Sequence, residues 1–137
     1  MNIPLSVTDN ITELLVKIIE FTRSRQKVLV MNINNVYNPG FVPKDLAVDE
    51  FSELLSDAID EHARSQRLLL RDTKSIKFGT AGAFEIEPEV DESARVLFEN
   101  NPDEYLELQI NKLLENSLNQ RVAAELLRGK QEDIFDF

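Results

Sequence analysis

The chain has 137 residues, a length that most simply makes one domain. Its 25 acidic and 15 basic side chains give a formal net charge of -10, which argues against binding to nucleic-acid phosphates or to anionic lipid. The chain has no cysteine, which excludes disulfides, thiol catalysis and zinc–thiolate sites. No apolar run is long enough to span a bilayer, and the segment from Met1 to Leu5 does not have the form of a cleavable signal.

A long amphipathic helix is expected from about Asn10. Asn10 with Glu13 three residues later resembles a capping box, which would start the helix there. Residues 23–27 are basic and polar, and they predict a solvated helix face, with control of register as the alternative. Apolar residues recur at steps of three and four on one stripe, which contains Ile11, Leu15, Ile18, Ile19, Leu29, Ile33 and Val36.

The run from Asn32 to Phe41 is expected to end this helix and redirect the chain. Pro39 fixes its own φ and restricts the residue before it, and Gly40 relieves the steric limit after it. The amides of Asn32 and Asn35 can bond the backbone groups that become free at a helix end. An ordinary helix-ending turn is the alternative to a functional hinge.

The middle of the chain is expected to form a helix and a β-hairpin. After an extended connector at 41–46, a stripe with helical spacing predicts a helix from about Asp49 to Leu68. Alternating apolar residues at 76–78 and 84–86, around a loop with Gly79 and Gly82, predict a short β-hairpin. Val96 and Phe98 predict another extended piece, and the acidic run 85–92 is also typical of a mobile segment. The helical stripe contains Phe51, Leu54, Leu55, Ala58, Ile59 and His62.

A last helix is expected to begin near Pro102, a residue suited to a first turn, and to stop at Gly129 as its C-cap. Residues 131–137 are then expected to fray. The predicted fold is mainly α, with long terminal helices able to form a coiled coil, a middle helix and a small central segment. The terminal helices could pair with each other, pair with those of neighbouring subunits, or share the core of a small helical domain. The last stripe contains Leu106, Ile110, Leu113, Ser117, Ala124 and Leu127, and is widened by Leu114, Leu118 and Val122.

The sequence predicts no catalytic, cofactor or metal site. His62 lies on an apolar stripe, which is more typical of a packed residue than of a base or ligand. The loop at Gly79 lacks the Lys-Ser/Thr of a phosphate loop, and the carboxylate spacing fits neither a calcium loop nor an acid/base pair. We therefore expect a protein that is not an enzyme. An enzymatic alternative would need the acidic run 85–92 to meet His62.

Two motifs resemble the flagellar basal-body rod protein family, and most closely its proximal rod proteins. That family carries Arg-Gln-x-x-Leu followed by Asn-Ile-Ala-Asn-x-x-Thr-Pro-Gly-Tyr/Phe. Here Arg25-Gln26-Lys27-Val28-Leu29 runs into Asn32-Ile33-Asn34-Asn35-Val36-Tyr37-Asn38-Pro39-Gly40-Phe41, with Asn34 in place of alanine and Asn38 in place of threonine. The segments 44–46, 115–118 and 124–130 are also similar to the family. The segment 77–102 and the acidic tail are not.

The resemblance implies a structural rod subunit in the periplasmic basal body, exported through the flagellar type III apparatus without a cleaved signal. It implies partners among the other rod proteins and the rod/MS-ring adaptor, in a homo- or hetero-oligomer. Residues 1–40 would be an assembly helix and turn, 41–102 a middle region able to fold without residues 1–30, and 103–137 a second assembly helix with its tail. The alternative is a cytoplasmic helical adaptor or chaperone-like protein that binds a basic partner.

The site residues that the resemblance to rod proteins implies fall into two groups. The assembly turn contains Asn32, Ile33, Asn35, Pro39, Gly40 and Phe41. The helix stripes that would meet other subunits contain Ile11, Leu15, Ile18, Leu29, Ile110, Leu113 and Leu127.

Overall fold

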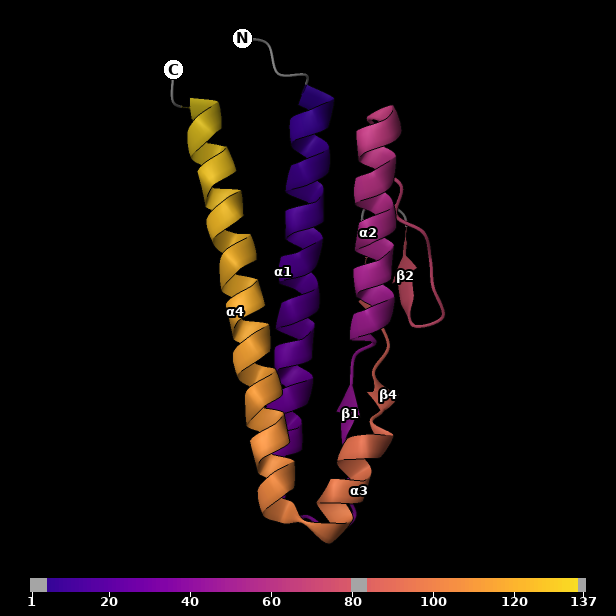
Figure 1. Ribbon diagram of the computed structural model, residues 1–137, viewed down its shortest axis with the longest axis vertical. Coiled ribbons are helices and arrows are strands. Elements are labelled where there is room, and N and C mark those ends of the chain that lie inside the picture. The colour runs from indigo at the N-terminus through magenta and orange to yellow at the C-terminus, as the bar shows by residue number, and fades with distance from the viewer. Residues whose placement is uncertain (1–4, 80–83, 136–137) are drawn as a thin grey trace.

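The computed structural model describes residues 5–79 and 84–135 and is mainly helical, which confirms the predicted fold class. Its helices are α1 (Leu5–Asn34), α2 (Val48–Ser65), α3 (Glu92–Asn100) and α4 (Pro102–Phe135). The long helices lie side by side in the order α4, α1, α2, and α3 forms a corner that leads into α4 (Figure 1). No helix in the described part of the chain is both long enough and apolar enough to cross a membrane.

The two terminal helices form an antiparallel pair within one chain. α1 packs along α4 much more extensively than along α2, and the two chain ends lie at the same end of the molecule (Figure 1). Leu15 and Leu29 of α1 are buried, and Leu29 is fully so. Burial of such a side chain stabilises the fold by about 1.5–3 kcal/mol. Of the arrangements that the sequence left open, pairing within the chain is therefore present.

Two small antiparallel sheets occupy the middle of the chain. β1 (Lys44–Asp45) pairs with β4 (Glu89–Val90), with Lys44 opposite Val90. β2 (Ile76–Phe78) pairs with β3 (Phe84–Ile86), with Phe78 opposite Phe84. The predicted hairpin is thereby confirmed, although residues 80–83 of its loop, with Gly82, lie outside the described residues. The acidic run 85–92 contributes to β3, to β4 and to the start of α3.

The main core lies where α1 meets α2 and the hairpin. The rings of Phe21 and Phe51 are parallel, with their centres 4.0 Å apart, and Phe84 lies tilted against Phe51 at 6.2 Å. The cluster also contains Leu46, Leu54 and Ile76, all of them buried. Because α1 contributes Phe21, the middle region shares its core with the N-terminal helix.

Two predicted helix boundaries in the first half are wrong. α1 already includes Leu5, so Asn10 lies inside the helix and not at its N-cap. Its amide donates to the carbonyl of Gln66 (3.0 Å) and lies 3.3 Å from Nδ1 of the half-buried His62. α2 ends at Ser65, before the predicted Leu68, because Gln66 adopts a left-handed conformation (φ 61°). The contact of Asn10 with α2 is long-range, and local sequence spacing could not predict it.

Three predictions in the second half are also wrong. Val96 and Phe98 lie in α3, whose N-cap Asp91 accepts a hydrogen bond from the backbone N–H of Ala94 (3.1 Å). Gly129 does not end α4, which continues to Phe135. Glycine disfavours a helix by only about 1 kcal/mol relative to alanine, so a long helix can continue through it. Residues 131–135, predicted to fray, are helical, and 136–137 lie outside the described residues.

Candidate assembly site

The predicted turn motif forms a hydrogen-bonded turn after α1. The N–H of Phe41 donates to the carbonyl of Asn38 (3.0 Å), which puts Pro39 at the second position of a four-residue turn, where its fixed φ is favourable. Gly40 is exposed, a Cβ there would meet no atom within 4 Å, and its φ lies outside the left-handed region. The predicted steric role of Gly40 is therefore wrong, because the turn does not itself require glycine at this position.

Asn32 connects this turn to both neighbouring elements. Its Oδ1 accepts from the N–H of Lys44 (3.1 Å), and its Nδ2 donates to the carbonyl of Lys44 (2.7 Å). The same Nδ2 donates to Oε1 of Gln109 on α4 (2.9 Å). The side chain of Asn35 donates to the carbonyl of Met31 in the last turn of α1 (2.9 Å). Asn35 therefore bonds a backbone group at the helix end, as predicted, whereas the prediction for Asn32 is wrong, because its side chain bonds the backbone of Lys44 in β1.

Aromatic side chains pack at the same corner of the molecule. The hydroxyl of the fully buried Tyr105 donates to the carbonyl of Asn32 (2.8 Å). The ring of Tyr105 meets Phe98 at 5.1 Å, and Phe98 meets Phe41 at 6.1 Å. Burial, with a smaller effect from the charge of Asp91, raises the pKa of Tyr105 to about 12, so its hydroxyl remains a donor at neutral pH. Tyr105 lies outside the predicted stripe, which began one residue later, at Leu106.

A charged network lies beside Asn32. Asp45 accepts two hydrogen bonds from Arg25 (2.9 and 3.1 Å) and one from Lys112 (3.0 Å), which also donates to Asp91 (2.6 Å). Burial alone would raise the pKa of Asp45, but the hydrogen bonds and charges of Arg25 and Lys112 outweigh it and lower that pKa. Burial would lower the pKa of Lys112, but its two carboxylate partners raise it. The network joins α1, β1, α4 and the N-cap of α3.

One residue of this network, Arg25, is buried where the sequence predicted a solvated position. Arg25 was predicted to lie on a solvated face with the rest of residues 23–27, but it is buried against Asp45. Its neighbours Arg23 and Lys27 are exposed, as predicted. A buried arginine was not foreseeable from its neighbours, because its partner lies twenty residues away in β1.

The interface between α1 and α4 also contains buried amides. Nδ2 of Asn116 donates to the carbonyl of Thr22 (2.7 Å). Gln109 lies two helical turns before Asn116, so both amides face α1. Nε2 of Gln109 has no hydrogen-bond partner among the described residues. Buried amides at a helix interface specify register at a cost in stability, which fits a pair that must keep one alignment.

The face of α4 that packs on α1 differs from the predicted stripe. Ile110 is exposed, and Leu113 and Leu127 are only half-buried. On α1, Ile11, Ile18 and Ile33 are half-buried. The prediction counted large apolar residues, whereas the buried face of α4 consists mainly of an aromatic ring, amides and a small side chain: Tyr105, Gln109, Asn116 and Ala123.

α4 instead exposes a row of large apolar side chains, called the α4 row. Leu114 and Leu118 are 64% and 61% exposed. Residues four positions apart are displaced by about 40° around a helix, so the row winds by about 160° from its first member to its last. Its last two members also line a groove. The α4 row contains Ile110, Leu114, Leu118, Val122 and Leu126.

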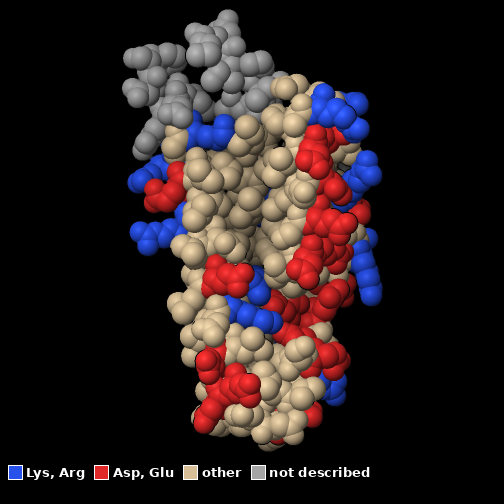
Figure 2. Space-filling view, viewed as in Figure 1, with Lys and Arg blue, Asp and Glu red and all other residues tan. Residues whose placement is uncertain are grey.

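That groove has a volume of about 300 Å³ and lies between α2 and α4, with α1 as its floor. Figure 2 shows a band of uncharged surface between the charged flanks of the molecule. The apolar lining includes Ile18 and Phe21 of α1, Phe51 and Leu55 of α2, and Val122 and Leu126 of α4.

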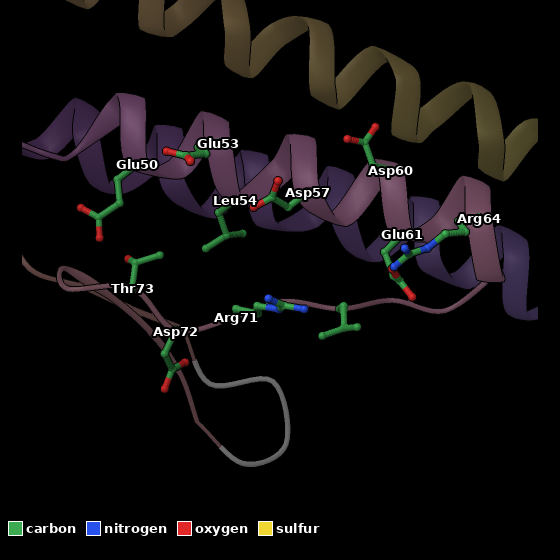
Figure 3. A pocket seen from close by; sticks show the side chains of 11 residues that line it. Glu50, Glu53, Leu54, Asp57, Asp60, Glu61, Arg64, Arg71, Asp72 and Thr73 are labelled. Atoms are coloured by element: carbon green, nitrogen blue, oxygen red, sulfur yellow. The ribbon is translucent and has the colours of Figure 1, made fainter.

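The outward face of α2 carries an acidic ridge beside this groove, visible as a red band in Figure 2. The ridge borders a second cleft of about 610 Å³, which Arg71 and Thr73 also line (Figure 3). Hydrogen bonds from Thr73 and from the backbone N–H of Ser75 lower the pKa of Glu50 in that cleft. No group of three or more His, Cys, Asp or Glu residues in the described chain could hold a metal ion. The acidic ridge contains Asp49, Glu53, Asp57 and Asp60.

The residues of the enzymatic alternative have other contacts. Glu89 of the acidic run accepts from the hydroxyl of Ser75, whose N–H donates to Glu50 in the first turn of α2. His62 lies in the last turn of α2 and contacts Asn10. These contacts place the acidic run and His62 toward opposite ends of α2.

No protein-family model matches this chain, and neither a curated protein nor a solved structure matches it. The resemblance to rod proteins therefore rests on the motifs of the chain itself.

Proposed function

We propose that this protein is a structural subunit of the bacterial flagellar basal-body rod, located in the periplasmic rod. The observation that carries the proposal is that the two helices bearing rod-like motifs form one antiparallel pair, while the α4 row stays exposed on it. Contiguous exposed apolar side chains are typical of protein–protein contact surfaces. The pair is therefore suited to packing against neighbouring subunits, and this role requires no catalytic group or cofactor.

In this proposal the turn sets the angle between the helix pair and the rest of the subunit. Asn32 bonds both β1 and α4, and the hydroxyl of Tyr105 bonds the backbone of Asn32. Such a connection keeps the contact surfaces of one subunit in a fixed relation, which a repeating assembly requires. The proposed partners are other rod proteins and the rod/MS-ring adaptor.

The test is a strain of the source bacterium that lacks the gene. We expect it to lose swimming, to lack complete rods, and to regain both when the gene is restored. Mass spectrometry of purified basal bodies should detect the protein. Normal swimming of the deletion strain, or basal bodies without the protein, would contradict the proposal.

Gly40→Val separates assembly from folding. Because a Cβ at this exposed position meets no atom, the free energy of unfolding should change by less than about 0.5 kcal/mol. If partners contact the turn, incorporation into basal bodies should fall several-fold while export into the periplasm is maintained. Gly40→Ala, with a smaller side chain, is the matched control and should assemble better than Gly40→Val. Equal loss of export and incorporation would point to a general defect instead.

The acidic ridge favours a second candidate, a helical adaptor for a basic partner. Such binding would weaken strongly with salt because exposed charges are screened. Fractionation distinguishes the two functions: an adaptor stays in the cytoplasm with its partner, whereas a rod subunit is recovered with basal bodies.

A further inference from the structure

We propose that the groove between α2 and α4 binds an amphipathic helix of a different protein, with an apolar stripe flanked by Lys or Arg. This inference rests on the proposed function, whose partner it specifies by chemistry. It is supported by the shape and apolar lining of the groove, by the charge along its borders, and by the net charge of the chain.

The groove has the form that a helix needs. On α4 it extends from Asn116 to Leu126, and ten residues of helix span about 15 Å, or nearly three turns. On α2 it extends from Val48 to Leu55. Leu126 is 56% exposed, so apolar surface remains open to solvent in the isolated subunit. A helix laid in such a groove would bury one stripe of its side chains, the usual mode of helix-in-groove recognition.

The borders of the groove carry negative charge. Asp49 is exposed on α2 beside the lining residue Val48, and Glu115 is exposed on α4 beside the lining residue Asn116. The one basic residue in the lining, Arg25, is paired with Asp45. A helix with basic flanks would therefore meet complementary charge.

A second copy of this chain fits the groove less well. Each copy has a formal net charge of -10, so two copies repel each other at long range. On α4, Glu115 is exposed beside the lining residue Asn116 and would meet the acidic border of the other copy, whereas Glu125 is paired with Arg128 (2.6 Å). Charge thus favours a different protein as the occupant, while Leu114 and Leu118 of the α4 row remain available for other contacts.

The test uses three synthetic 21-residue peptides with the full-length protein. The first has a leucine stripe with lysine flanks, the second has the same stripe with glutamate flanks, and the third keeps the lysines but has serine in place of leucine. Fluorescence anisotropy should show the first peptide binding at least tenfold more tightly than either control. Its affinity should fall at least tenfold between low and high salt.

Two matched variants locate the binding. Leu126→Asp, in the groove, should weaken binding of the leucine–lysine peptide at least tenfold, whereas Leu114→Asp, on the same helix outside the groove, should change it less than twofold. Both replace exposed leucines, so both should fold, and circular dichroism checks this. If Leu126→Asp does not fold, Ser52→Arg provides the test, because it places bulk and positive charge at a lining position.

Three results would overturn the inference. The first is an equal loss of peptide affinity in Leu126→Asp and Leu114→Asp. The second is an affinity for the glutamate peptide equal to that for the lysine peptide. The third is a dimer of the chain in sedimentation that only the groove variants disrupt, which would assign the groove to a second copy. These outcomes are separate from the rod role. A gene deletion that leaves swimming intact contradicts the rod function, whereas the peptide results concern only the groove.

Discussion

Asn32 gives Lys44 the donor and acceptor that a neighbouring strand would otherwise provide. Its amide lies in a buried position, with 1% of the residue exposed, and it also reaches Gln109 on α4. Buried backbone groups are costly when they lose their partners, so the energetic importance of this residue comes from the groups that it satisfies.

Asn32→Ala should lower the free energy of unfolding by roughly 2–4 kcal/mol, because several polar groups lose a partner in a site that water does not easily reach. Urea unfolding followed by circular dichroism measures this change. Asn38→Ala is the control, since its side chain is exposed and makes a long contact to Asn35 (3.3 Å); it should cost less than about 0.5 kcal/mol. Equal effects of the two variants would contradict this role of Asn32.

Asp45 predicts how stability depends on pH. Its pKa is lower in the folded state than in the unfolded chain, so its contribution is complete above about pH 4 and is lost as the pH falls through the folded value. Asp45→Asn should reduce the free energy of unfolding by about 1–3 kcal/mol at pH 7. The difference from the parent should shrink as the pH falls below about 4, as measured by urea unfolding at each pH. A difference independent of pH would exclude this ion pair as its cause.

At the scale of the elements, α4 combines two surfaces with different chemistry. Toward α1 it presents an aromatic ring, two amides and a small side chain, and on its exposed surface it presents the α4 row, whose last two members line the groove. Nε2 of Gln109 has no hydrogen-bond partner among the described residues, which costs stability. This face of α4 therefore favours one alignment of α1 and α4 at the expense of stability. The length of α4 beyond Gly129 was hidden in the sequence because glycine is the residue most often found just after a helix end.

Gly129→Ala tests the extent of α4. The residue lies inside the helix, its φ is outside the left-handed region, and a Cβ there meets no atom within 4 Å. Alanine should therefore raise the free energy of unfolding by about 0.5–1 kcal/mol. A C-cap glycine in the left-handed conformation would give the opposite sign. Thermal unfolding followed at 222 nm distinguishes these outcomes.

At the scale of the whole molecule, the N-terminal helix belongs to two interfaces at once. It pairs with α4 along its length, and it contributes Phe21 to the core with Phe51. The expectation that the middle region folds without residues 1–30 is therefore not consistent with this core. Removal of α1 would expose the apolar surfaces of α2, of the hairpin and of α4 together.

A chain that begins at residue 31 should be largely unfolded, with loss of most α2 helicity and of tertiary structure. Proton–nitrogen NMR spectra should show poor dispersion, and urea should produce no cooperative transition. The full chain measured in parallel is the control. A cooperative transition in the truncated chain would show that the middle region has an independent core.

Periodic spacing in the sequence located most of the elements. Long apolar stripes predicted α1 and α2, Pro102 predicted the start of α4, and alternation predicted the hairpin. The short helix α3 was missed because its pattern could be read as extended, and only its N-cap Asp91 signals it. The bond of Asn35 to the last turn of α1 was predicted because asparagine amides commonly bond nearby backbone groups at helix ends.

The sequence by itself determined the helical fold class, the place of the turn and the strongly acidic surface, because these depend on local spacing, on proline and asparagine, and on composition. Only the tertiary structure decided that Arg25 is buried with Asp45, that Asn32 bonds Lys44 and Gln109, and which face of α4 remains open. Each of these depends on residues far apart in the chain. The free energy of burying a polar side chain depends on its hydrogen-bond or ion-pair partner, and that partner cannot be predicted from the neighbouring residues in the sequence.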